Sequence, residues 1–170
     1  FPWTNTYLWS DHSYYYSVTS ALMALEAWAH ERIDNGDDIA IVIGDVLGDG
    51  KPPAAYVLVA VHLILSHWPD SASAGVPFVG SPELLSLDLD RTIRAGASNV
   101  DFLGLRGLHK EPATGPRLAS LRERISRRAT LDELFGNYAL LDAASTERLQ
   151  LRTLLAAAQK GGLFAILLAL

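Results

Sequence analysis

A nearly continuous apolar run, AAYVLVAVHLIL, constrains the fold more than any other part of the 170-residue chain. Pro52-Pro53 precedes the run, and proline is well tolerated at the start of a helix. Pro69 follows it, so the pattern predicts a helix from Ala54 to Trp68. Because this helix is apolar almost all round, we expect it to be the central buried element of the domain. The run is too short to span a bilayer.

Two more helices are predicted before this run. The first spans residues 17–33, where apolar residues recur at three- and four-residue spacing. The second begins after Asp37 or Asp38 and lies between Gly36 and Gly48. A strand is possible for the same residues, but the helical spacing favours a short helix. The apolar positions are Val18, Leu22, Leu25, Trp28, Ala29 and Ile33 in the first helix, and Ile39, Val42, Ile43, Val46 and Leu47 in the second.

Turn-forming residues divide the chain after Pro69. A loop is predicted through Ser71, Ser73, Gly75 and Pro77. Ser81 then caps a helix over residues 84–94. Residues 95–116 are rich in glycine and proline, which indicates a long connection.

Helical signals return in the last third of the chain. Residues 117–128 are basic and have the spacing of an amphipathic helix. Thr130 and Glu133 form a capping box, in which each side chain bonds a free N–H at the helix start. Ser145 opens a last long helix, which ends at Gly161-Gly162.

These elements predict an all-α fold, either a helical bundle or an α-solenoid-like segment of six to seven helices. We expect an aromatic leader over 1–16, a helical core over 17–94, a connection over 95–116 and C-terminal helices over 117–170. The start without Met and the apolar end LFAILLAL lead us to expect a piece of a longer protein, in which the C-terminal helices continue.

The segment GDVLGDGK, residues 44–51, resembles two kinds of ligand-binding loop in outline only. A Walker loop requires glycine where Asp45 lies and serine or threonine where Pro52 lies. An EF-hand loop requires metal-binding side chains where Leu47 and Tyr56 lie. Glycines and prolines in this order are typical of a corner between two helices, which we predict here. No cofactor is expected.

Composition narrows the classes of function. The formal net charge of −5 argues against a nucleic-acid surface. The chain has no cysteine, which excludes disulfides, thiolate zinc sites and a cysteine nucleophile. The N-terminal residues lack the layout of a secretory signal. We therefore expect a cytoplasmic protein that does not bind membranes.

One motif suggests a metal site. His30-Glu31-Arg32-Ile33-Asp34 is similar to the zinc-peptidase motif HExxH, and residues four apart share a helix face. No third ligand follows, so we interpret the motif as a charged helix end and predict no metal.

His62 and His67 are about 140° out of phase on a helix. We interpret His62 as a core histidine that needs a hydrogen-bond partner, and His67 as a helix-end residue, where an imidazolium is favourable.

Two groups of residues are candidates for binding a partner. Aromatic residues crowd the leader, and exposed aromatic groups favour protein contacts. Arginines cluster over 117–128, where salt bridges to acids such as Asp132 and Glu133 or an inter-domain contact are expected. The partner-binding candidates are Trp3, Trp9, Arg117, Arg124 and Arg128.

Several stretches are similar to the helical region of very large bacterial ATP-binding proteins, the STAND-type NTPases of defence systems. These stretches are SVTSALMALEAWAHERID, VIGDVLGDG, AAYVLVAVHLILSHWP, PFVGSPELLSLD and SRRATLDELFGNYAL. In that family the nucleotide site lies in a separate domain, so the resemblance transfers no functional residue. It implies a non-catalytic helical module that packs against the rest of a large protein.

The sequence therefore predicts a non-catalytic scaffold or interaction module, whose partners are other domains of its parent protein or another protein. A metal-dependent hydrolase that uses His30, Glu31 and Asp34 is one alternative. A nucleic-acid-binding domain that uses the arginines of 117–128 is another. No catalytic residue is predicted.

Overall fold

A computed structural model of the chain describes residues 16–98, 120–121 and 123–161. Within these ranges the protein is all-α, with seven α-helices and no strand, which confirms the predicted fold class. The helices are α2 (Tyr16–Asp34), α3 (Ile39–Leu47), α4 (Ala54–Ser66), α5 (Ala72–Val79), α6 (Pro82–Ser98), α8 (Leu131–Leu140) and α9 (Thr146–Gly161); the 3-10 turn η2 spans Ile125–Arg127.

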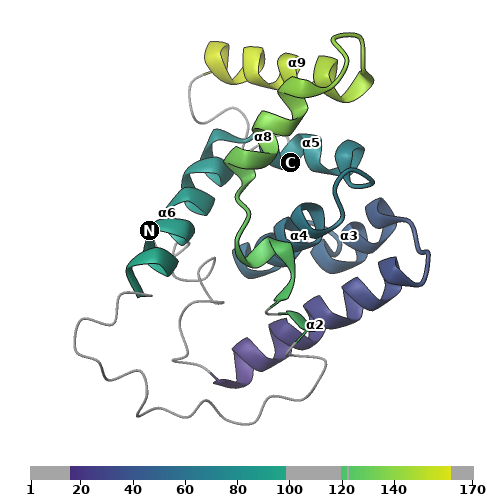
Figure 1. Ribbon diagram of the computed structural model, residues 1–170, viewed down its shortest axis with the longest axis vertical. Helices are drawn as coiled ribbons and strands as arrows, with labels where there is room; N and C mark the ends of the chain where they lie inside the picture. The colour runs from purple at the N-terminus through teal and green to yellow at the C-terminus, as the bar shows by residue number, and fades with distance from the viewer. Residues whose placement is uncertain (1–15, 99–119, 122, 162–170) are drawn as a thin grey trace.

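Helix α4 is the centre of the fold, as the apolar run predicts. Every residue from Leu58 to Leu65 is buried. Helices α2 and α3 pack on it from the N-terminal side, and η2, α5 and α8 pack on it from the rest of the chain. Figure 1 shows α2 at one end of the long axis and α9 at the other, with α4 between them. The helices therefore form a bundle-like arrangement around one apolar core.

The corner between α3 and α4 is confirmed as a turn between two helices. Asp38 caps α3, because its carboxylate accepts hydrogen bonds from the backbone N–H groups of Ala40 and Ile41. Gly48 and Gly50 have φ values of 68° and 99°, a region that favours glycine. The Asp45 carboxylate pairs with Arg32 of α2. The glycines of residues 44–51 are therefore explained by their place in a corner between two helices.

The predicted loop through Ser71, Ser73, Gly75 and Pro77 is wrong, because these residues lead into and form α5. Val76, Phe78 and Val79 are buried, and this apolar face holds the helix on the core. Pro77 lies inside the helix of 8 residues, where it removes one N–H and its ring crowds the carbonyl one turn back. The burial of three apolar side chains offsets this cost.

Helices α6 and α8 are joined by buried polar groups. Asp88 of α6 accepts a hydrogen bond of 2.8 Å from the backbone N–H of Leu131, the first residue of α8. Arg91 bonds Asp88 and donates to the carbonyl oxygen of Ala129. The capping box of Thr130 and Glu133 is present as predicted. The start of α8 is therefore fixed by charge as well as by apolar contact.

Two boundaries differ from the sequence prediction. Helix α6 continues to Ser98, so the connection predicted over 95–116 begins later, and the rest of it lies outside the described residues. The helix predicted over 117–128 is confirmed only in part, because the described residues 120, 121 and 123 are helical but the helix does not continue to residue 128. The backbone is extended at Arg124, and the 3-10 turn η2 follows. Arg124 and Arg128 therefore do not share a helix face.

Helix α9 lies across α5 and α8 at one end of the molecule (Figure 1). Leu151 of α9 is buried, and the side chain of Leu154, from the same helix, lies close to Gly80. A Cβ on Gly80 would be 2.8 Å from Leu154 Cδ1, so a larger residue there would push α9 away. Within the described ranges, no helix combines the length and the apolar character needed to cross a membrane.

Two glycine substitutions test this packing. A Cβ on Gly75 would lie 2.6 Å from the Tyr138 hydroxyl oxygen, which is buried and donates to the Ala72 carbonyl. We expect Gly75→Ala to lower the free energy of unfolding by about 1–3 kcal/mol, because overpacking forces the core to shift. Gly44 lies inside α3 with open space around it. Gly44→Ala should raise the free energy of unfolding by about 0.5–1 kcal/mol.

Urea unfolding of both variants measures these changes. A Gly75→Ala variant as stable as the parent chain would contradict the close contact between α5 and α8.

Candidate functional site

Glu26 is a carboxylate at the centre of the helical core. It lies on the face of α2 that also carries Leu22, Ala29 and His30, all of them buried against α4. Its side chain has an exposed fraction of 0%. Burying an isolated carboxylate is costly, so its position requires charged or hydrogen-bonding partners.

Three side chains contact the Glu26 carboxylate: Arg127 from η2, His62 from α4 and His30 from α2 itself. The Arg127 guanidinium of η2 donates a hydrogen bond of 2.6 Å to Oε2. On the other oxygen, Oε1, His62 Nδ1 of α4 lies at 3.1 Å and His30 Nε2 lies at 3.8 Å. We call Glu26, His30, His62, His67 and Arg127 the carboxylate–histidine cluster.

His67 extends the cluster towards the surface. Its Nε2 lies 2.9 Å from Nδ1 of His30, and the two rings are 5.1 Å apart. His67 is the C-cap residue of α4 and is half-buried, whereas His30 and His62 are buried. The cluster therefore runs from a partly exposed imidazole through a buried one to a buried carboxylate.

The cluster holds one negative and one positive charge at neutral pH. Burial by itself raises the pKa of the Glu26 carboxyl, but the contacts with His62, His30 and Arg127 outweigh it and hold that pKa well below its usual range. Burial lowers the pKa of His62 and of His30, and contact with Glu26 only partly opposes this effect. Glu26 is therefore ionised and paired with Arg127, and the buried imidazoles are neutral.

The His30–His67 contact is a hydrogen bond, whereas the His30–Glu26 contact is not. A neutral imidazole carries one N–H and one acceptor nitrogen, so one of the two rings donates to the other across the 2.9 Å between Nδ1 of His30 and Nε2 of His67. Nε2 of His30 lies 3.8 Å from Oε1 of Glu26, beyond hydrogen-bond distance, and this contact is electrostatic. The hydrogen bond between His30 and His67 links α2 to the end of α4.

The motif His30-Glu31-Arg32-Ile33-Asp34 does not converge on one point. His30 faces the cluster, whereas Glu31 is exposed. The Asp34 carboxylate accepts a hydrogen bond of 2.6 Å from Arg124. Among the described residues, no group of three or more His, Asp or Glu side chains is arranged to hold a metal ion. The geometry therefore gives a structural account of His30 and Asp34 without a ligand.

The described arginines of residues 117–128 either pair with acidic side chains of α2 or lie at the surface. Arg124 pairs with Asp34, and Arg127 pairs with Glu26. Arg124 and Arg127 therefore pair with acids of α2 and not with the expected Asp132 or Glu133, and Glu133 belongs to the capping box of α8. Arg128 is exposed. The other partner-binding candidates, Trp3, Trp9 and Arg117, lie outside the described residues.

Sequence analysis missed Glu26 as a functional residue. A signal was present, because Glu26 stands four residues after Leu22 and three before Ala29, inside the apolar stripe of α2.

His62 is buried, as predicted. His67 lies at the end of α4, as predicted, but burial and the neighbouring His30 lower its pKa and so oppose the expected imidazolium. Val18 and Trp28, predicted to be on the apolar face, are about half exposed.

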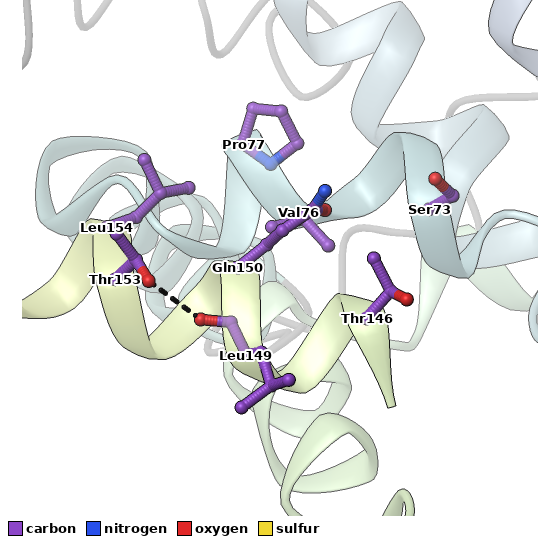
Figure 2. A pocket seen from close by; sticks show the side chains of 8 residues that line it. All are labelled: Ser73, Val76, Pro77, Thr146, Leu149, Gln150, Thr153 and Leu154. Carbon is purple, nitrogen blue, oxygen red and sulfur yellow. Dashed lines mark hydrogen bonds between the residues drawn. The ribbon is translucent and has the colours of Figure 1, made fainter. Parts of the chain in front are cut away.

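A shallow apolar groove lies at the other end of the molecule, between α5 and α9 (Figure 2). Val76 and Pro77 of α5 form one side, and Leu149 and Leu154 of α9 form the other. Leu149 is 49% exposed, which is high for a large apolar side chain. Ser73, Thr146, Gln150 and Thr153 complete the lining. The groove contains no member of the carboxylate–histidine cluster.

Comparison of the chain with models of protein families, with curated proteins and with solved structures finds no match. The carboxylate–histidine cluster and the groove between α5 and α9 are therefore interpreted from their own geometry.

Two carboxylate-to-amide substitutions in α2 form a matched test of the cluster. Each removes the acid partner of an arginine from the same segment. Glu26→Gln leaves Arg127 facing a neutral amide inside the core, so we expect a loss of about 3–5 kcal/mol in the free energy of unfolding. Asp34→Asn removes an exposed partner of Arg124 and should cost at most about 1 kcal/mol. Equal losses in the two variants, measured by urea unfolding, would show that Glu26 has no special role.

Acid should destabilise the fold in a histidine-dependent way. The pKa values of His30 and His62 in the folded state lie below the ordinary 6.5, so the unfolded chain binds more protons between the two values. Their contribution to stability is complete above about pH 6.5 and is lost as the pH falls. The lowered pKa of Glu26 acts in the same direction below its ordinary 4.5. Thermal unfolding should therefore show a falling Tm from pH 7 to pH 5, and His62→Gln should reduce that slope. A Tm that rises over this interval would contradict the neutral histidines.

Proposed function

We propose that this chain is a non-catalytic helical scaffold that binds an apolar segment in the groove between α5 and α9. The single observation that carries the proposal is the half-exposed Leu149, which lines the same groove as Val76, Pro77 and Leu154 (Figure 2). Exposed apolar side chains that gather in a groove are typical of sites that receive an apolar helix.

The occupant that fits best is an apolar helix from another domain of the parent protein. The lining is almost free of charge, so neither a nucleic acid nor a strongly charged peptide would find a partner there. The resemblance to the helical region of STAND-type NTPases supports the same proposal, because such a region packs against other domains. In this proposal the protein works in the cytoplasm.

The position of the polar groups supports a scaffold rather than an enzyme. The strongest titratable cluster of the described residues is enclosed by α2, α4 and η2, and its carboxylate is fully buried. A substrate could not reach Glu26 without separating these elements. The groove between α5 and α9 contains no member of the cluster.

Peptide selection tests the groove. The whole chain is used to select binders from a phage library of helical peptides, and the selected peptides are then measured against two variants. Leu149→Asp places a charge at the groove and should weaken binding at least about tenfold, because burying an unpaired charge is costly. Leu140→Asp is the matched control, since Leu140 is 85% exposed at the end of α8 and does not line the groove.

Circular dichroism of both variants checks that they remain folded. Peptides that bind the Leu149→Asp variant as tightly as the parent chain would eliminate this groove as the docking surface.

A further inference from the structure

The segment 123–129 packs on α4 and is joined to α2 by two ion pairs. Two arginines from this segment reach two carboxylates of α2, which lie 101 and 90 residues away in sequence. Arg127 pairs with Glu26 inside the core, and Arg124 pairs with Asp34 at the surface. Ile125, a large apolar residue of the segment, is 60% exposed. The docking of η2 therefore depends on the charge states of its partners.

We propose that the carboxylate–histidine cluster is an acid-operated latch, which holds η2 against α2 and α4 at neutral pH and releases it when the pH falls. A latch of this kind requires one group that gains a proton and one that can leave.

The buried imidazoles gain the proton. His62 and Arg127 contact opposite oxygens of the same carboxylate, Oε1 and Oε2 of Glu26. When His62 is neutral, the carboxylate and the guanidinium balance each other. A proton on His62 places two cations around one buried anion, and the excess charge then lies in a site of low dielectric constant, which is costly. One of the two cations must then move into solvent.

Arg127 is the cation that can leave. His62 is fixed within α4 and is fully buried, whereas the Arg127 side chain is 19% exposed and belongs to a turn of 3 residues. The residues that follow η2 limit the release to this segment. Arg91 bonds the Ala129 carbonyl, and Asp88 bonds the Leu131 backbone N–H. These contacts are independent of Glu26, so α8 should stay in place while η2 detaches.

Other charged groups around the histidines set where the latch opens. Cationic side chains oppose protonation of the imidazoles, and the acids near His67 favour it but are largely exposed and therefore screened by salt. These groups are Glu26, His30 and Asp34 from α2, His62 and His67 from α4, Asp70 after α4, Arg91 from α6, and Arg124 and Arg127 from the segment of η2. Burial of His62 and His30 places the opening below about pH 6.5.

Hydrogen exchange followed by mass spectrometry tests the latch on the full chain at about pH 7.5 and about pH 5.5, after correction for intrinsic exchange rates. Peptides covering 123–129 should lose protection at least about tenfold at the lower pH. Peptides from the interior of α4 and from α8 should keep theirs.

Two variants separate the parts of the device. His62→Gln cannot gain the proton, so its segment 123–129 should remain protected at both pH values. Arg127→Gln lacks the residue that holds η2, so the same segment should exchange rapidly at both pH values. If the pH response is unchanged in His62→Gln and also in the double variant with His30→Gln, the latch does not exist. Loss of protection in all helices at once would contradict it too, because that would be global unfolding.

A second measurement serves if His62→Gln does not fold. The ¹⁵N resonances of the histidine rings in the parent chain report when each ring gains its proton. The latch requires that His62 or His30 titrates over the same pH interval in which segment 123–129 loses protection. Protection that is lost while both rings are still neutral would overturn the proposal.

Discussion

The buried Glu26 carboxylate is the interaction on which the arrangement of the other elements depends. It joins α2 to α4 through His62, and it joins α2 to η2 through Arg127. An ionised carboxylate in an apolar core is tolerated only while these partners are in place. The apolar contacts of α4 would permit many relative rotations of the helices, whereas the carboxylate permits few. Burial supplies the stability of this core, and the charge selects one geometry.

The opposite end of the molecule is organised differently. There α5 approaches α8 and α9 closely, because Gly75 leaves room for the Tyr138 hydroxyl and Gly80 leaves room for Leu154. Asp88 fixes the start of α8 by a single buried hydrogen bond. Helices α5 and α9, which line the groove, lie towards this end, and α2, which carries Glu26, lies at the other (Figure 1). The proposed groove and the proposed latch therefore depend on different elements of the fold.

The sequence predicted the elements whose signals are local and missed those that depend on tertiary contact. Helix α4, the Asp38 cap and the Thr130–Glu133 capping box follow from apolar runs and short-range hydrogen bonds, and all are present. Helix α5 was missed because Pro77 indicates a loop locally, although its apolar face is held by the core. Glu26 was missed because its partner Arg127 is 101 residues away, and no spacing rule connects them.

A double-mutant cycle between Glu26 and Arg127 tests the central claim most directly. The free energies of unfolding of the parent chain, Glu26→Gln, Arg127→Met and the double variant give the coupling between the two side chains. If the carboxylate and the guanidinium form a buried pair, we predict a coupling energy of about 2 kcal/mol or more, with the double variant less damaged than the sum of the single variants. A coupling energy near zero would show that the two residues do not interact in the folded protein.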